Sequence, residues 1–381
     1  YEINSSMRFS KANSAYLTRT PSSASNQRTF TLSFWCKRGE FGLATAPILS
    51  AYSDGSNFSL FRFASDKLQF YTITSGTDYS EQTSGVFRDN ASWYHIVLRV
   101  DTTQSTASSR IRIYANGTLQ TTTQPHGQIT QDYDTFINTT NAHNLGRNLD
   151  STSQFVGGYL AEVHFVDGTS LTPSSFGETK EGVWIPKSVT GVTYGTNGYY
   201  LKFNQTGSRT PSATTMGADS SGEDNHWSQA NINPIDSNLP DSPTNNFCIM
   251  NQLRNFGGGT IEIGGCKFVS GSSEYGPATS TFAVSSGKWY AELDQNSATT
   301  TFAFGAVRTD TELTTSFGLG NATSFCYRQG GTKGIDGTFT SYGATWSQND
   351  IIGMALNMDD NEVTFYKNNT GQGTFSFTAG E

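Results

Sequence analysis

The stretch "NDIIGMALNMDDNEVTFYKNN", residues 349–369, decides the fold class. Large apolar side chains alternate with small or polar ones from Ile352 to Met358, and the alternation resumes at Val363 after an Asp-Asp-Asn run. Successive side chains of a β-strand point to opposite faces, so a period of two predicts a strand with one buried face. Asp and Asn are typical turn residues. The stretch therefore predicts two antiparallel strands joined by a turn.

The same order of elements occurs earlier, in "WYHIVLRVD", residues 93–101, and "RIRIYANG", residues 110–117. The second segment ends on Asn-Gly, the strongest short signal for a hairpin turn. In each segment the apolar residues share one face: Tyr94, Ile96, Leu98 and Val100 in the first, and Ile111 and Ile113 in the second. Two such strand pairs predict two β-sandwiches of related build.

Composition agrees with an all-β protein. The 381 residues include 39 Gly and 13% aromatic residues, whereas only 15% are charged and 35% hydrophobic. A disordered chain would be poor in aromatic residues. Here the polarity comes from turn-forming residues, and aromatic and β-branched residues suit the strands between turns. Helical patterns are confined to residues 172–178 and 309–315. The length favours two or three domains.

The charge balance excludes some classes of partner. Lys and Arg number 24 and Asp and Glu number 32, so the net charge is 24 − 32 = −8. Nucleic-acid binding needs clustered cations, so no nucleic-acid partner is expected. No apolar run approaches 18 residues, so no membrane span is expected. The chain starts at Tyr1 without a visible signal peptide, and we expect it to be a piece of a longer protein.

The four cysteines are not spaced as zinc ligands. We expect free, half-buried thiols. A bridge between Cys248 and Cys266 remains an alternative that spacing does not resolve.

Three regions follow one another along the chain. Residues 1–204 are predicted to form the first sandwich, with Phe9 and Phe203 in its core. Residues 205–254 are rich in Asn, Ser and Pro and are predicted to form an extended, turn-rich connector. Trp227 and Phe247 are expected to anchor it to one or both domains. Residues 255–381 are predicted to form the second sandwich, without its last strands because the final segment stops abruptly. Three tryptophans are expected in the cores: Trp93, Trp289 and Trp346.

Two segments of the chain resemble known families. "SSGKWYAELD", "FAFGAV" and the opening stretch resemble the SPRY (B30.2) family over about residues 255–381. "FTLSFWCKRG", "WYHIVLRVD" and "GYLAEVHFVDG" in residues 1–204 resemble laminin G-like or concanavalin A-like lectin domains. The resemblance implies two concanavalin-like, jelly-roll antiparallel β-sandwich domains and a binding function.

A wider resemblance points to a source. "GVWIPK", "DSSGEDNHW" and "DSPTNNF" are similar to segments of virion proteins from tailed bacteriophages, especially marine ones. This implies a tail fibre, head fibre or similar appendage at the virion surface that binds a host-surface glycan or protein. It also implies contacts with other virion proteins and a homo-oligomer. The alternative is a purely structural decoration or assembly protein of the virion.

Catalytic groups are sparse, and no enzyme activity is expected. Glycoside hydrolases need two carboxylates across the sugar, and concanavalin-like ones carry an E-x-D-x-(x)-E run. Glu292 and Asp294 begin such a run, but the third carboxylate is missing, and Glu162 stands alone. A glycoside hydrolase is therefore the least favoured alternative. His95 and His164 lie on predicted strands, and we interpret them as outward-facing or hydrogen-bonded imidazoles, not as catalytic ones.

Candidate ligand contacts are aromatic and amide side chains in loops, because sugars stack on rings and bond to planar polar groups. Core packing is the competing interpretation for each aromatic residue. The candidates in the first region are Tyr52, Asp54, Asn57 and His143. Those in the second region are Tyr275, Tyr327, Tyr342 and Trp346.

No cofactor is expected, and calcium is the one metal to consider, since Asp and Asn oxygens in rim loops can hold it. The candidate ligands are Asp54, Asn57, Asp132, Asp134, Asn141 and Asn144. Ordinary turns require the same residue types, so both interpretations stay open.

Overall fold

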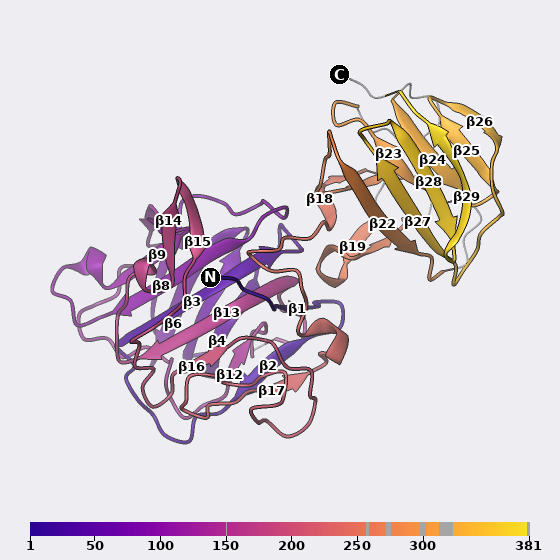
Figure 1. Ribbon diagram of the computed structural model, residues 1–381. Coiled ribbons are helices and arrows are strands. Elements are labelled where there is room, and N and C mark those ends of the chain that lie inside the picture. The colour runs from indigo at the N-terminus through magenta and orange to yellow at the C-terminus, as the bar shows by residue number, and fades with distance from the viewer. Residues whose placement is uncertain (150, 257–258, 272–275, 298–301, 312–322, 379–381) are drawn as a thin grey trace. The chain divides into compact units, whose positions relative to one another are not determined.

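The chain divides into two compact units in a computed structural model that describes residues 1–149, 151–256, 259–271, 276–297, 302–311 and 323–378 (Figure 1). Unit 1 comprises Tyr1–Gln252 and Ile261–Phe268, and unit 2 comprises Leu253–Thr260 and Val269–Glu381. Within the described ranges the helical elements are four single 3-10 turns, and no helix could cross a membrane. The predicted all-β fold is confirmed.

The 3-10 turns are η1 (Ala107–Ser109), η2 (Pro173–Ser175), η3 (Pro234–Asp236) and η4 (Ile263–Gly265). The helix predicted at residues 172–178 is therefore the single turn η2. The other predicted helix, residues 309–315, lies largely outside the described residues.

Unit 1 contains a seven-stranded antiparallel sheet. Its strand order is β1 (Met7–Phe9), β13 (Gly158–Asp167), β3 (Thr29–Arg38), β8 (Tyr94–Asp101), β9 (Ile111–Ala115) and β10 (Thr118–Leu119), with β16 (Tyr199–Leu201) also pairing with β13. Asn116 and Gly117 both have positive φ in the tight turn between β9 and β10, which confirms the Asn-Gly hairpin.

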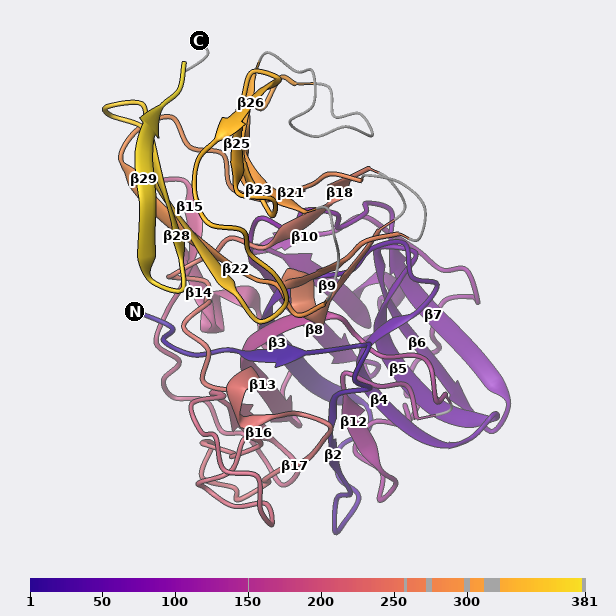
Figure 2. The ribbon, with the colours of Figure 1, turned by 90° about the vertical axis from the view of Figure 1, so that its right-hand side faces the viewer.

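Facing it is an eight-stranded sheet, the second layer of the sandwich (Figure 2). Its strand order is β11 (Thr122–Thr123), β7 (Thr77–Thr83), β6 (Lys67–Thr74), β5 (Asn57–Ala64), β4 (Ala46–Asp54), β12 (His143–Leu145), β2 (Tyr16–Arg19) and β17 (Ser228–Ala230).

The core of unit 1 lies between these sheets and follows the predicted alternation. The expected strand residues are in it: Ile96, Leu98, Val100, Ile111 and Ile113, with Tyr94 packed against them. Phe9 and Phe203 are fully buried and meet edge to face with 6.4 Å between ring centroids. The inward face of each strand therefore buries its apolar side chains, the main favourable term in folding.

The opposite, outer face of the seven-stranded sheet is also covered. Trp35, Trp93 and Tyr159 form one apolar cluster there, and Val97 and Val166 belong to another. The hairpin of β14 (Gly177–Lys180) and β15 (Val183–Pro186) accompanies these clusters through the partly buried Trp184. All ten residues of β13 are consequently buried.

Residues 205–252, predicted as most of a connector, belong to unit 1. Trp227 is 1% exposed and packs edge to face on Tyr199, so the prediction of an anchor there is confirmed. Phe247 is 45% exposed, so the second predicted anchor is wrong. Its side chain points outward because its backbone is held instead: the Phe247 N–H donates to Asp241, and its carbonyl accepts from Lys37.

The Lys37–Asp241 ion pair ties this segment to β3. The Lys37 side chain is fully buried, and its Nζ lies 3.0 Å from Asp241 Oδ2. Asp241 Oδ1 also accepts hydrogen bonds from the Trp93 indole at 3.2 Å and the Phe247 N–H at 3.1 Å. A buried ammonium group is tolerated only when it is paired and hydrogen-bonded, so this carboxylate is indispensable to Lys37.

We therefore expect Asp241→Ala to destabilise unit 1 by about 3–5 kcal/mol, because it leaves a buried cation without its counter-charge. Urea unfolding followed by tryptophan fluorescence measures the change. Glu223→Ala, at an exposed carboxylate of the same region, is the matched control and should change stability by less than about 0.5 kcal/mol. Equal unfolding midpoints for both variants would contradict the role of the pair.

Unit 2 contains two four-stranded antiparallel sheets. The first has the order β22 (Lys288–Asp294), β27 (Ile351–Asn357), β28 (Glu362–Lys367) and β29 (Thr370–Ser376). The second has the order β23 (Ala303–Val307), β24 (Ser324–Arg328), β25 (Thr332–Ile335) and β26 (Thr338–Ser341). Two further short pairs contain residues assigned to each of the two units: β18 (Met250–Asn255) with β21 (Ala278–Ser280), and β19 (Thr260–Glu262) with β20 (Lys267–Val269).

The stretch at residues 349–369 forms β27 and β28, as its alternation predicts. Met354 pairs with Phe365 and Leu356 with Val363, and all four side chains lie in the core of unit 2. Asn361 has a φ of +56° in the intervening turn. Asn tolerates this left-handed conformation better than most residues, which explains its place there.

Trp289 differs from the prediction, whereas Trp93 and Trp346 are buried as expected. Trp289 is 45% exposed because β22 is an edge strand that, within the described ranges, has β27 as its one neighbour in the sheet. Its indole N–H donates to the Ser286 carbonyl at 2.8 Å. All four cysteines are free, so the described structure has no Cys248–Cys266 bridge.

Candidate functional site

The open face of unit 1 is the outer face of the eight-stranded sheet. Strand register places Tyr52 beside Phe58, Leu60 beside Tyr71, and Arg62 beside Gln69. These residues alternate with the core residues of the same strands, so they point away from the core. We call the outward set Tyr52, Phe58, Arg62, Tyr71 and His126 the outer belt.

The rings of the outer belt touch in sequence. Tyr52 and Phe58 have 6.1 Å between centroids, Phe58 meets Tyr71 edge to face at 5.4 Å, and Tyr71 lies 4.6 Å from His126. Tyr52, Phe58 and Tyr71 are half-buried, and His126 is exposed. Such contacts restrict the rings while leaving part of each surface open, which is the arrangement of an aromatic binding platform.

Two charged groups, Asp78 and Arg62, lie against Tyr71 in the outer belt. Asp78 accepts a hydrogen bond from the Tyr71 hydroxyl at 3.2 Å and lies 2.8 Å from His126 Nδ1. Burial, followed by the Asp78 charge, raises the pKa of Tyr71, so its hydroxyl stays protonated. Arg62, whose guanidinium carbon lies 5.8 Å from the Tyr71 ring centroid, donates from Nε to Gln69 at 2.9 Å and from Nη1 to Thr45 at 2.8 Å.

Of the residues predicted for the first region, Tyr52 lies in the outer belt, and two others lie beside it. Asp54 and Asn57 close the turn between β4 and β5: the Asp54 carboxylate accepts the Ser56 N–H at 2.8 Å and the Asn57 amide at 3.1 Å. Both side chains are therefore engaged in the turn next to the platform.

His143 is a structural residue. It is 6% exposed, its Nε2 accepts the Asn138 N–H at 3.1 Å, and its Nδ1 donates to the Asn141 carbonyl at 2.8 Å. Burial lowers the pKa of His143 to about 4, so it is neutral at pH 7. Its burial argues against the predicted ligand contact.

The candidates in unit 2 do not form an open site. Tyr327 and Trp346 are buried in the core, and the Tyr327 hydroxyl donates to the Ala344 carbonyl. Tyr342 is half-buried, and its ring meets Phe375 edge to face at 5.2 Å. Tyr275 lies outside the described residues. Core packing, the competing interpretation in the sequence, accounts for the described tyrosines.

The predicted calcium ligands have protein partners or are buried. Asp132 and Asp134 both pair with Arg28, at 3.7 and 2.6 Å. The Asn141 amide contacts Thr139, and Asn144 is fully buried with neither amide atom hydrogen-bonded to a described residue. In the described ranges, no three His, Cys, Asp or Glu side chains gather as a metal site would require. Calcium binding by these residues stays untested.

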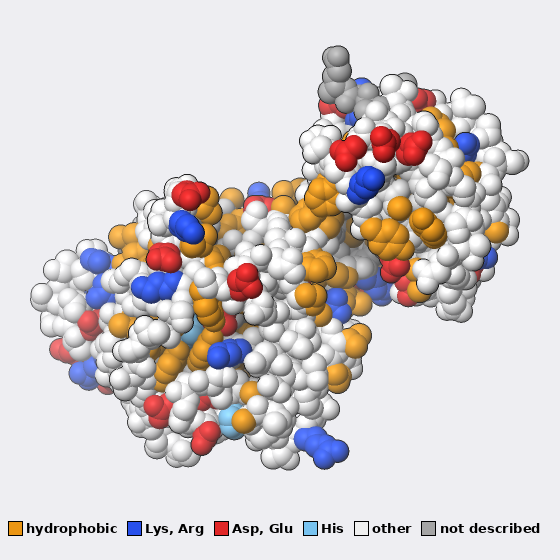
Figure 3. Space-filling view, in the orientation of Figure 1, with side chains coloured by type: hydrophobic (Ala, Val, Ile, Leu, Met, Phe, Trp, Pro, Cys, Tyr) orange, Lys and Arg blue, Asp and Glu red, His pale blue; other side chains and the backbone are white. Residues whose placement is uncertain are grey.

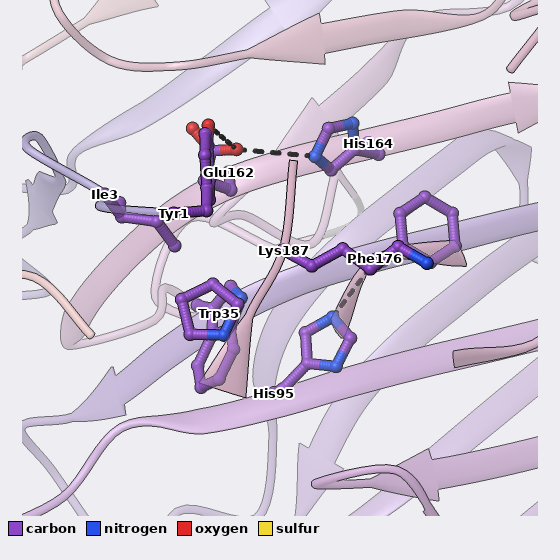
Figure 4. A pocket seen from close by; sticks show the side chains of 10 residues that line it. Tyr1, Ile3, Trp35, His95, Glu162, His164, Phe176 and Lys187 are labelled. Carbon is purple, nitrogen blue, oxygen red and sulfur yellow. Dashed lines mark hydrogen bonds and ion pairs between the residues drawn. The ribbon is translucent and has the colours of Figure 1, made fainter. Parts of the chain in front are cut away.

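A second group of polar residues lies on the outer face of the seven-stranded sheet (Figure 4). Glu162 has a φ of +47° in a β-bulge of β13, where it and Val163 together lie opposite Phe34, between the pairs Ala161–Trp35 and His164–Ser33. Its carboxylate accepts from the Tyr1 hydroxyl at 3.0 Å and the Tyr200 hydroxyl at 2.5 Å, and lies 3.7 Å from His164 Nε2.

Both ring nitrogens of each buried histidine of this group lie close to polar protein groups. His95 contacts Ser33 through Nε2 at 2.9 Å and accepts the Trp184 indole N–H at Nδ1, at 3.0 Å. His164 Nδ1 is hydrogen-bonded to the Tyr194 hydroxyl at 2.7 Å, and its Nε2 lies 3.7 Å from the Glu162 carboxylate. The ring nitrogens of His95 and His164 therefore face protein groups and are not available to act on a substrate.

The space beside these residues is small. It measures about 180 Å³, counted out to open solvent, which is below the 300–1,000 Å³ of typical ligand pockets. Its lining includes one carboxylate, that of Glu162, whereas glycoside hydrolysis requires a facing pair. Figure 3 shows a histidine set among hydrophobic side chains on this face of unit 1. We conclude that this polar network stabilises the fold and that the outer belt is the better candidate site.

The sequence reasoning missed most of the outer belt: Phe58, Arg62, Tyr71 and His126. The segments "FSLFRF" and "KLQFYTI" are apolar at both alternating phases, so hydrophobicity does not identify the core face. Arg62 could have identified the outward face of its strand, because arginine side chains are mostly exposed in folded proteins.

Buried neutral histidines predict a pH-dependent stability. Burial lowers the pKa of His95 to about 3, that of His143 to about 4, and that of His164 despite the opposing effect of Glu162. Below the ordinary pKa of about 6.5 the unfolded chain binds protons that the native chain does not. Stability should be complete above pH 6.5 and fall toward pH 4, by up to about 1.4 kcal/mol per pH unit for each histidine.

Urea unfolding at pH 7 and pH 5 measures this dependence. His143→Asn should reduce the slope, because it removes one of the buried neutral imidazoles. Equal stability at the two pH values would show that the three imidazoles are not held neutral by the fold.

Family comparisons agree with this description. Residues 11–175 match the concanavalin A-like lectin/glucanases superfamily, in a model of laminin G type, and residues 288–379 match the SPRY domain. A comparison with curated protein sequences finds no match.

Solved structures show distant likeness. A putative carbohydrate-binding protein of Bacteroides ovatus is 15% identical over 60% of this chain and 58% of that chain, with a TM-score of 0.35. Mouse laminin α1 domains LG4-5 are 8% identical over 99% and 82%, with a TM-score of 0.35. The SAP-like pentraxin of Limulus polyphemus is 18% identical over 45% and 80%, with a TM-score of 0.33. The two family matches support a laminin G-like domain followed by a SPRY domain in one polypeptide.

Proposed function

We propose that this protein is a non-catalytic carbohydrate-binding protein and that the outer belt holds the glycan. The observation that carries the proposal is the row of half-exposed rings flanked by a fixed carboxylate and a fixed guanidinium group. Sugar rings pack their C–H faces on aromatic rings, and their hydroxyls bond to planar polar groups. The match of residues 11–175 to a lectin and glucanase superfamily supports the proposal.

The finer proposal concerns where the protein acts. The resemblance of several segments to virion proteins of tailed bacteriophages supports an appendage at the virion surface that binds host-surface glycan or protein. Other virion proteins and further copies of this chain would be its partners. Antibody labelling of intact particles, seen by electron microscopy, tests the location. Firm incorporation without any glycan binding would favour the structural alternative.

Tyr71→Ala tests the outer belt. The variant should weaken glycan binding about three- to tenfold, because a ring contact contributes about 0.5–1.5 kcal/mol. Glycan-array screening followed by titration of the strongest ligand measures the effect. Tyr290→Ala is the matched control, since Tyr290 is 56% exposed but belongs to unit 2. An unchanged affinity of Tyr71→Ala, with native thermal stability, would exclude the outer belt.

The hydrolase alternative has its own test. Incubation with host polysaccharide should release no reducing ends, because the Glu162 pocket lacks a second carboxylate. If reducing ends accumulate and Glu162→Gln abolishes them while the protein remains folded, then the protein is an enzyme and the binding proposal is incomplete. Glu292→Gln serves as the matched carboxylate variant in unit 2.

A further inference from the structure

Two arginines on the outer face of the eight-stranded sheet have no acidic partner among the described residues. Some arginines of unit 1 pair with carboxylates, as Arg38 and Arg88 both do with Asp66. Arg62 and Arg147, by contrast, have no carboxylate within 4.0 Å among the described residues. In a chain with a net charge of −8, these two guanidinium groups give one face of the sheet a local positive charge.

Arg62 is held in one orientation. Its Nε and Nη1 are engaged by Gln69 and Thr45, and its guanidinium carbon lies 5.8 Å from the Tyr71 ring centroid. Nη2 has no hydrogen-bond partner in the described part of the chain. Burial lowers the pKa of Arg62, although the group remains charged at neutral pH. A partly desolvated cation without a counter-charge is costly unless a ligand supplies one.

Arg147 lies in the same row of the sheet. The Gly146 N–H donates to the Ile48 carbonyl at 2.9 Å, which continues the pairing of β12 with β4 and brings Arg147 beside Pro47. Pro47 pairs on its other side with Arg62. The Arg147 guanidinium carbon lies 4.8 Å from the Tyr16 ring centroid, so an aromatic ring supports it too.

The acidic group of the outer belt does not neutralise these cations. Asp78 is engaged by His126 and the Tyr71 hydroxyl. Among the described residues, the face therefore carries a carboxylate engaged by His126 and Tyr71, and two guanidinium groups without a carboxylate partner on either side of Pro47.

We propose that Arg62 and Arg147 make the outer belt selective for acidic glycans, in which a sugar carries a carboxylate or a sulfate. The inference rests on the proposed carbohydrate-binding function. A guanidinium group offers planar, paired N–H donors that match the oxygens of such anions. The overall negative charge opposes binding along an extended polyanion, so recognition involves one or two anionic groups at this row.

The test is an array of glycans in matched pairs that differ by one carboxylate or one sulfate. Wild-type protein should prefer the acidic member. Arg62→Gln should reduce binding to that member roughly tenfold or more while leaving the neutral member unchanged. Arg62→Lys keeps the charge but not the planar fork, so it should lose part of the affinity. The carboxylate and sulfate arms identify which anion is recognised.

Arg112→Gln is the matched control, because Arg112 lies on β9 in the other sheet and also lacks a carboxylate within 4.0 Å in the described ranges. Thermal unfolding verifies that each variant is folded. Equal binding to both members of each pair, or equal losses in Arg112→Gln and Arg62→Gln, would overturn the acidic preference while leaving carbohydrate binding intact. Failure of the wild type to bind any glycan would instead reject the proposed function itself.

Discussion

The buried ion pair between Lys37 and Asp241 determines which face of unit 1 is available for binding. It fastens the segment around Asp241 over the outer face of β3, where the clusters of Trp35 and Trp93 lie. With that face covered, the seven-stranded sheet is enclosed on both sides. The outer face of the eight-stranded sheet is then the broad surface on which half-exposed aromatic side chains remain.

Exposure, more than residue type, separates the two polar groups of unit 1. Glu162, His95 and His164 are the residue types that usually suggest chemistry, yet they are buried and hydrogen-bonded to neighbouring side chains of the fold. Tyr71 and Arg62 are less suggestive in sequence, yet they combine fixed geometry with open surface. A ligand can replace solvent on the second group without dismantling hydrogen bonds, whereas it would have to break them in the first.

The sequence predicts the fold well because alternation reports directly on which side chains are buried. Leu356 and Ile96 are typical: each lies on the apolar phase of a strand and is in a core. The prediction failed for Trp289, since a position in an edge strand depends on sheet order, which local sequence does not encode. It missed Phe58 and Tyr71 because their strands are apolar in both phases, so only the assembled sandwich decides which phase faces outward.

The bulge at Glu162 changes which residues of β13 face the core. Leu160 and Val163 both face the core, three positions apart, because Glu162 is one residue more than a regular strand would hold. Without an extra residue, strict alternation would turn Glu162 inward and Phe165 outward. The left-handed backbone of Glu162, which costs about 1 kcal/mol or more, is thus what keeps a carboxylate out of the hydrophobic interior. Glu162 therefore shifts the alternation of the strand by one residue. A β13 that lacked this single residue would direct the same side chains to the core and the same side chains outward.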